Sequence, residues 1–121
     1  MAEMHNKYGE FSQSQIQDVK KGIRKNIIFL LAIADPKLKD EYKHINVNAA
    51  FDSLLNELSG MNSLLDNPPE IVTIMSLLES ALLEYNSSYF DFSRYRKMIL
   101  DACAKVNFIK EVDYESNSKH V

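Results

Sequence analysis

Three histidines are the residues best suited to acid–base chemistry or metal binding, and they lie far apart in the chain, at His5, His44 and His120. Glu41 and His44 have the Glu-x-x-His spacing of carboxylate-bridged metal centres in helical bundles. Such centres need a second pair of this kind and two further glutamates that point inward. Only one pair is present, in a polar connecting segment, so the sequence predicts neither a metal site nor a catalytic histidine.

The cysteine and the glycines indicate neither a nucleophile nor a phosphate-binding loop. Cys103 lies between Ile99 and Val106 on an apolar stripe, where we expect a small buried side chain rather than a reactive thiolate. The glycines are isolated, and no Gly-rich loop, Gly-x-Ser-x-Gly or Cys-x-x-Cys pattern occurs. We therefore expect a protein that is not an enzyme and has no cofactor.

Two clusters of basic residues could contact a phosphate backbone, although a solvated basic face is the favoured interpretation. They are Lys20, Lys21, Arg24 and Lys25, and then Arg94, Arg96 and Lys97. The second cluster falls at an expected helix start, where cations oppose the helix dipole. That placement indicates either contact with phosphates or compensation by the nearby acids Glu79, Glu84 and Asp91. A nucleic-acid-associated regulator is therefore the alternative function, although a helix-turn-helix reader needs a more polar recognition helix.

The overall composition is that of one globular domain. The chain has 121 residues, 45% of them hydrophobic, and a net charge of −3, which argues against a broad nucleic-acid partner. A single cysteine and the lack of a basic-then-apolar leader lead us to expect a cytoplasmic protein. Eleven lysines against three arginines, with ten asparagines, favour an AT-rich bacterial or phage source.

Apolar residues recur with the helical period in four segments. The first helix is expected from a cap at Ser12 or Ser14 to Ala34, where Asp35-Pro36 ends it. The second is capped by Asn46 or Asn48, with Gly60 expected to break or bend it. Asn67 caps a third helix at about 68–86, whose mostly apolar circumference suggests a central position. Asp91 or Ser93 caps the last, which ends near Val112.

These elements predict an all-α fold, a compact and antiparallel bundle of about four amphipathic helices. A packing of the same helices at steeper angles is the alternative. The expected organisation is a flexible lead-in at 1–11, a single helical domain at 12–112 and a disordered tail at 113–121.

The run Ile27–Ala34 holds eight consecutive apolar residues. A membrane span needs about 20 residues, so we expect no membrane insertion. Three apolar side chains of this run do not fit on a single stripe that faces the core: Ile28, Phe29 and Leu31. They are either buried between neighbouring helices or are the interface with a partner or a second copy of the chain.

The absence of chemical motifs and the surplus apolar surface favour a small non-enzymatic protein that acts by protein–protein interaction, as an inhibitor, an adaptor or an immunity-type protein. Its size and expected architecture are similar to those of small helical bacteriocin-immunity proteins, a likeness at the level of the fold alone. An acidic chain suits a basic partner through electrostatic steering. The partner itself and the oligomeric state are open, with a homodimer as one alternative.

Overall fold

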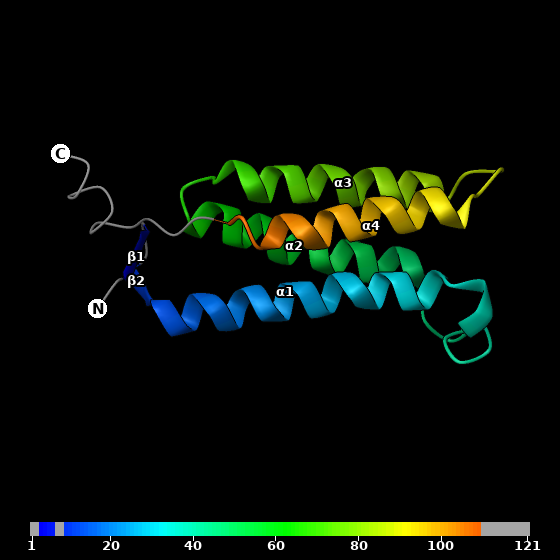
Figure 1. Cartoon of the computed structure of the whole chain (residues 1–121), viewed down its shortest axis with the longest axis horizontal. Helices are drawn as coiled ribbons and strands as arrows, with labels where there is room; N and C mark the ends of the chain where they lie inside the picture. Colours follow the sequence, from blue (N-terminus) through cyan, green and yellow to red (C-terminus); the bar gives the residue numbers. More distant parts are fainter. Residues whose placement is uncertain (1–2, 7–8, 110–121) are drawn as a thin grey trace.

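The computed structural model describes residues 3–6 and 9–109 of the chain (Figure 1). Four α-helices make up most of it: α1 (Gln13–Ala34), α2 (Val47–Leu64), α3 (Pro69–Tyr85) and α4 (Phe92–Val106). A single 3-10 turn, η1 (Pro36–Leu38), follows α1, and two short strands, β1 (Glu3–Asn6) and β2 (Gly9–Ser12), precede it. The prediction of an all-helical domain with four helices is confirmed for the main body of the molecule.

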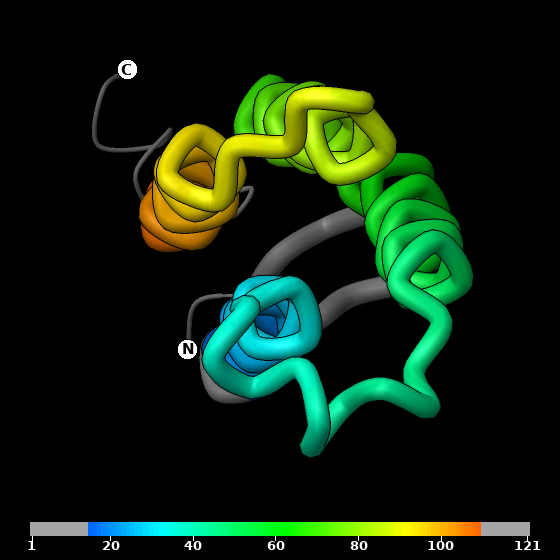
Figure 2. The backbone as a smooth tube through the Cα atoms, turned by 90° about the vertical axis from the view of Figure 1, so that its right-hand side faces the viewer, coloured from blue at the N-terminus to red at the C-terminus, as the bar shows by residue number. Residues whose placement is uncertain are grey.

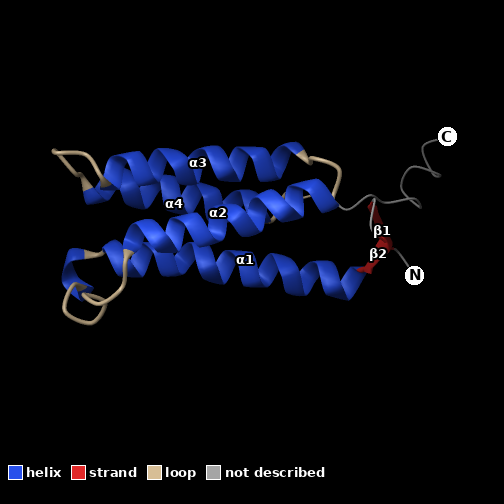
Figure 3. Ribbon diagram, turned by 180° about the vertical axis from the view of Figure 1, so that it is seen from behind, coloured by secondary structure: helices blue, strands red, loops and turns tan. Residues whose placement is uncertain are grey.

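The helices run up, down, up and down, each antiparallel to the next along the chain (Figure 1). The end-on view in Figure 2 shows them around one core, with α1 beside both α2 and α4, and α3 beside the same two. Their axes lie close to parallel in Figures 1 and 3, so the antiparallel bundle, rather than the steeper packing, is the observed arrangement. Neighbours in sequence are thus neighbours in space, and α4 closes the ring against α1.

Side-chain caps start the helices where the sequence offered two choices. Asn46 caps α2 by accepting a hydrogen bond from the Ala49 amide, so Asn48 is not the cap. Asp91 caps α4 by accepting from the amides of Ser93 and Arg94, so Ser93 lies inside the helix. Each cap satisfies an amide that has no partner within its own helix.

Three expected boundaries were wrong. Asn67 is not the cap of α3, because it and Asp66 have positive φ angles of 58° and 60°, which leave Pro68 as the cap. Gly60 does not break α2, since the helix runs on to Leu64. The last helix ends at Val106 rather than near Val112, and tighter turns continue it as far as Ile109.

The core centres on Tyr95 of α4, whose side chain is fully buried. Its hydroxyl donates a hydrogen bond of 2.6 Å to the carbonyl of Leu30 in α1. Its ring lies edge-on to Phe51 of α2 and beside Tyr85 of α3, at centroid distances of 6.2 Å in both cases. One side chain therefore contacts the other three helices.

Helix α3 is not central, contrary to the sequence prediction. It buries one face, formed by Ile71, Ile74, Leu78 and Ala81, like the other helices. Val72 and Leu83 on its outer side remain 48% and 74% exposed. A small bundle has room for no helix enclosed on all sides, so the apolar residues beyond one stripe remain at the surface.

The hairpin of β1 and β2 occupies most of the segment predicted as a flexible lead-in. Its strands are antiparallel, with Glu3 opposite Ser12 and Asn6 opposite Gly9. Little in the sequence indicates it, because neither Asn-Gly nor Asp-Gly, the usual signals of a two-residue hairpin, occurs in residues 1–12. The tail predicted at 113–121 lies outside the described residues. Among the residues described, no helix combines the length and apolar character needed to cross a membrane.

Replacing Gly22 or Gly60 with alanine is expected to stabilise the protein by about 0.5–1 kcal/mol each, because alanine loses less backbone entropy in a helix. A Cβ at either position meets no atom within 4 Å. Urea unfolding measures the change, and Lys21→Arg, which barely alters helix propensity, is the control. Lower stability of both variants would contradict unstrained helical geometry at the glycines.

Replacing Tyr95 with phenylalanine is expected to cost about 0.5–1.5 kcal/mol, because the bond to the Leu30 carbonyl is lost while the ring stays. Tyr89→Phe is the matched control, since Tyr89 is 86% exposed and should change stability little. The same urea unfolding experiment compares the two. Equal stability of the two variants would show that the hydroxyl contributes nothing.

Candidate interaction surface

The apolar run Ile27–Ala34 is divided between the core and the surface. Ile27 and Leu30 are fully buried, and Ile33 and Ala34 nearly so. Ile28 and Phe29 are 43% and 39% exposed, and Leu31 is half-buried against the core. The helix turns about 100° per residue, so a run of this length has to cover every side of α1.

The three candidate interface residues do not share one face of α1. Arg24, Ile28 and Leu31 follow one another at the spacings of four and three residues that line one side of a helix. The guanidinium of Arg24 bonds to Asn107 just beyond α4, so this side faces α4. Phe29 points the other way, because residues one and two positions apart do not face each other on a helix.

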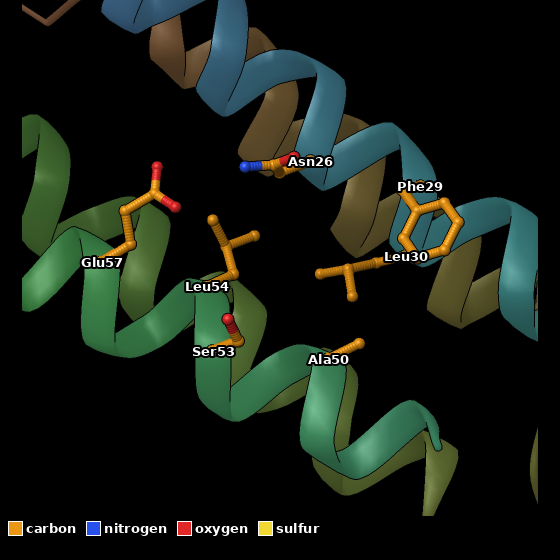
Figure 4. A pocket seen from close by; sticks show the side chains of 7 residues that line it. All are labelled: Asn26, Phe29, Leu30, Ala50, Ser53, Leu54 and Glu57. Atoms are coloured by element: carbon orange, nitrogen blue, oxygen red, sulfur yellow. The ribbon is translucent and has the colours of Figure 1, made fainter. Parts of the chain in front are cut away.

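Phe29 belongs instead to a small groove between α1 and α2. Figure 4 shows its ring at the end of this groove, near Leu30 of α1 and Ala50 of α2. The groove has a volume of about 200 Å³. The ring also lies edge-on to Tyr42 at 5.9 Å, in the connection that follows α1. Phe29 therefore lies apart from Ile28 and Leu31, and a role of the three residues in an interface stays a prediction.

Lys20 is not part of an exposed basic patch. It is only 8% exposed, and its amine donates a hydrogen bond of 3.0 Å to the carbonyl of Ile109. Arg24, one turn further, donates to the Oδ1 of Asn107, also at 3.0 Å. These two cations of α1 hold the chain segment after α4, and the buried carbonyl that Lys20 satisfies explains why a charged side chain lies inside the bundle.

Arg94 is engaged with acids rather than with solvent alone. Its Nε lies 3.1 Å from Glu84 of α3 and 3.9 Å from Asp91. Glu84 also accepts a hydrogen bond from the Asp91 amide, which ties α3 to the start of α4. The compensation expected from nearby acids is therefore present at Glu84 and Asp91, and Arg94 faces α3.

Five predicted basic residues are exposed: Lys21 and Lys25 on α1, and Arg94, Arg96 and Lys97 on α4, of which Arg94 is paired with Glu84 and Asp91. On α4, Arg96 begins a stripe that continues with Leu100, Cys103 and Asn107, at spacings of four and three residues. Asn107 bonds to Arg24, so this stripe faces α1. The two stripes lie side by side on antiparallel helices and form one surface, which we call the α1–α4 face.

The α1–α4 face has an apolar middle and basic surroundings. Ile28 and Leu100 are its exposed apolar residues, 43% and 36% exposed, with Leu31 half-buried beside them. The sequence interpretation missed Leu100, although its spacing of four from Arg96 was visible. Cys103 lies on the same stripe and is half-buried. Burial raises the pKa of its thiol, and the charge of Arg24 offsets only part of this effect, so the thiol stays protonated at neutral pH.

Charge is segregated between the two halves of the bundle. Helices α1 and α4 carry eight lysines and arginines and only two acids, Asp18 and Asp101. Helices α2 and α3 carry five acids and neither lysine nor arginine. Since α1 lies beside α4 and α2 beside α3, one side of the molecule is basic and the other acidic. The net charge of −3 conceals this arrangement.

Among the described residues, no group of three or more histidine, cysteine, aspartate or glutamate side chains is placed to hold a metal ion. Comparison with known proteins found no matching family model, no matching curated protein and no matching solved structure.

Replacing Lys20 with methionine is expected to cost about 1–2 kcal/mol, because the Ile109 carbonyl loses its charged donor. Lys21→Met, one residue away and exposed, is the matched control and should stay within about 0.5 kcal/mol of the wild type. Thermal and urea unfolding measure both. A Lys20 variant as stable as the control would mean that the buried amine does not hold α1 to the end of α4.

Proposed function

We propose that this protein is a small non-enzymatic binding protein that acts through its α1–α4 face on a protein partner. The observation that carries the proposal is the pair of exposed apolar residues, Ile28 and Leu100, on a face where Arg96 and Asn107 are also exposed and Lys25 and Lys97 each lie three residues before one of the pair. Protein interfaces commonly have an apolar centre and a polar rim. Inhibitor, adaptor and immunity-type roles all operate in this way, by occupying a surface of the partner.

The charge of the face defines the partner's chemistry. Lys21, Lys25, Arg96 and Lys97 are all exposed around the apolar middle. They favour an acidic partner, with an apolar side chain that covers Ile28 and Leu100, since complementary charge raises the rate of association and excludes wrong partners. This differs from the basic partner that the net charge suggested. A cytoplasmic location and a bacterial or phage source, which the composition favours, accompany the proposal as expectations.

A nucleic-acid-associated regulator is the second candidate, because the same four cations could neutralise phosphates. Two observations favour the protein partner. The two other cations of the first cluster, Lys20 and Arg24, are already bonded to Ile109 and Asn107. The exposed apolar pair in the middle of the face offers nothing to a phosphate backbone, while it matches what a protein interface buries.

The test is affinity capture with three forms of the protein from the cells that encode it. Ile28→Asp with Leu100→Asp disrupts the face, and Val72→Asp with Leu83→Asp is the control, since those residues are an exposed apolar pair on α3. We expect one acidic partner to be captured by the wild type and by the control. Binding by the face variant should fall at least tenfold, with circular dichroism showing that all three forms are folded.

Binding of duplex DNA over a salt series separates the two candidates. The proposal predicts little binding at moderate salt. Tight DNA binding that weakens steeply with salt, and that is lost when Lys21, Lys25, Arg96 and Lys97 are changed to glutamine, would favour the regulator instead. Loss of the captured protein in the α3 control but not in the face variant would place the interface on the acidic side and contradict the proposal.

A further inference from the structure

The connection between α1 and α2 is much longer than the other helix connections. It spans residues 35–46, while those before α3 and α4 span 65–68 and 86–91. Antiparallel neighbours in a bundle need only about 2–8 residues, so the extra length is not required to join the helices. Figure 3 shows this connection at the end of α1, where it includes η1.

The connection is held in a defined shape. Asp35 caps η1 by accepting a hydrogen bond from the Lys37 amide. The Tyr42 amide bonds to the Leu38 carbonyl, and the Ile45 amide bonds to the Tyr42 carbonyl. Tyr42 and Ile45 pack against the core. An ordered, extended loop of this kind is a common place for a binding site.

This loop covers one side of a pocket of about 420 Å³ at the end of the bundle. Ile33, Ala34 and Val47, all buried, form its floor. Its walls are Tyr42 and Ile45 of the loop, Tyr85 at the end of α3, and Phe90 in the connection between α3 and α4. The volume lies in the range of sites that bind small molecules. An apolar and aromatic lining is also typical of such sites.

The charged residues of the pocket are at its rim. Lys39 and Lys43 are exposed, and both line the pocket. Asp35 is the one acid among the lining residues, and its Oδ1 is engaged in the cap of η1. The lining residues therefore carry two cations against one acid, beside an apolar interior.

We propose that this pocket binds a small organic anion, with its aromatic or aliphatic body between Tyr42, Tyr85 and Phe90 and its anionic group beside Lys39 and Lys43. The three aromatic rings suit an apolar body, since rings of this kind bury a large area at low entropic cost. The two lysines suit a carboxylate, sulfonate or phosphate. The site is distinct from the α1–α4 face, because none of its lining residues belongs to either stripe of that face.

Two fluorescent probes that differ in charge test the proposal. Anilinonaphthalene sulfonate is an aromatic anion, and N-phenylnaphthylamine is a neutral compound of similar shape. Changing Lys39 and Lys43 together to glutamine is expected to weaken binding of the anionic probe about five- to tenfold. Binding of the neutral probe is expected to stay unchanged. Lys21→Gln with Lys25→Gln removes the same charge on α1 and is the matched control, expected to bind both probes like the wild type.

Amide NMR spectra with decanoate or naphthoate locate the site and identify the preferred body. Saturable shifts are expected in residues 33–47 and 85–90, and the tighter of the two compounds shows whether an aliphatic or an aromatic body is favoured. Shifts elsewhere, no saturation with any probe, or equal loss of both fluorescent probes in the lysine variant would each overturn the proposal. A protein partner that binds over the pocket residues, with no small anion bound in the pocket, would overturn the proposal as well.

Discussion

A phenol buried at the centre of a helical bundle needs an acceptor for the hydrogen bond that its hydroxyl donates, and this requirement constrains the arrangement around Tyr95. Its hydroxyl has the Leu30 carbonyl as acceptor, at 2.6 Å. Burial, with a smaller contribution from Tyr85, raises the pKa of that hydroxyl well above its usual value, so it stays a donor. The bond sets how far α4 slides along α1. That register places Ile28 and Leu100 on adjacent stripes, and the bonds of Lys20 and Arg24 at the other end of α1 are consistent with it.

Most of the fold could be predicted because its signals are local. Asp35-Pro36 ended the first helix at the right residue, and Asn46 and Asp91 were among the proposed caps. The errors came from features that depend on backbone angles or on the rest of the molecule. Nothing in the letters at 66 and 67 reveals that both residues have positive φ. The sequence of a mostly apolar helix such as α3 does not show how many neighbouring helices will cover it. In the structure Leu83 of α3 is exposed.

The candidate surface was only partly predictable. Lys20 was grouped with its basic neighbours, although its spacing of four from Ile16 and three from Ile23 put it on the buried stripe. The sequence held that signal, but the acceptor that makes burial possible, the Ile109 carbonyl, lies 89 residues away. Ile28 and Phe29 are adjacent in sequence and face different helices, which becomes visible only once the partners of α1 are known. Leu100 was missed for the same reason, since it becomes part of a shared surface only when α4 is placed beside α1.

The sign of a partner's charge could not be taken from the composition. The net charge is an average over a molecule whose basic and acidic residues lie on opposite sides. Packed helix axes lie about 8–10 Å apart, and the Debye length at physiological salt is about 8 Å. A group that approaches the α1–α4 face therefore interacts mainly with the cations of that face, and the acids of α2 and α3, a further helix away, are largely screened.

Like charges gathered on two adjacent helices cost some stability. The bundle reduces this cost by bonding Lys20 and Arg24 internally and by pairing Arg94 with Glu84. Lys21, Lys25, Arg96 and Lys97 are left exposed around an apolar middle, the arrangement that an acidic partner would complete.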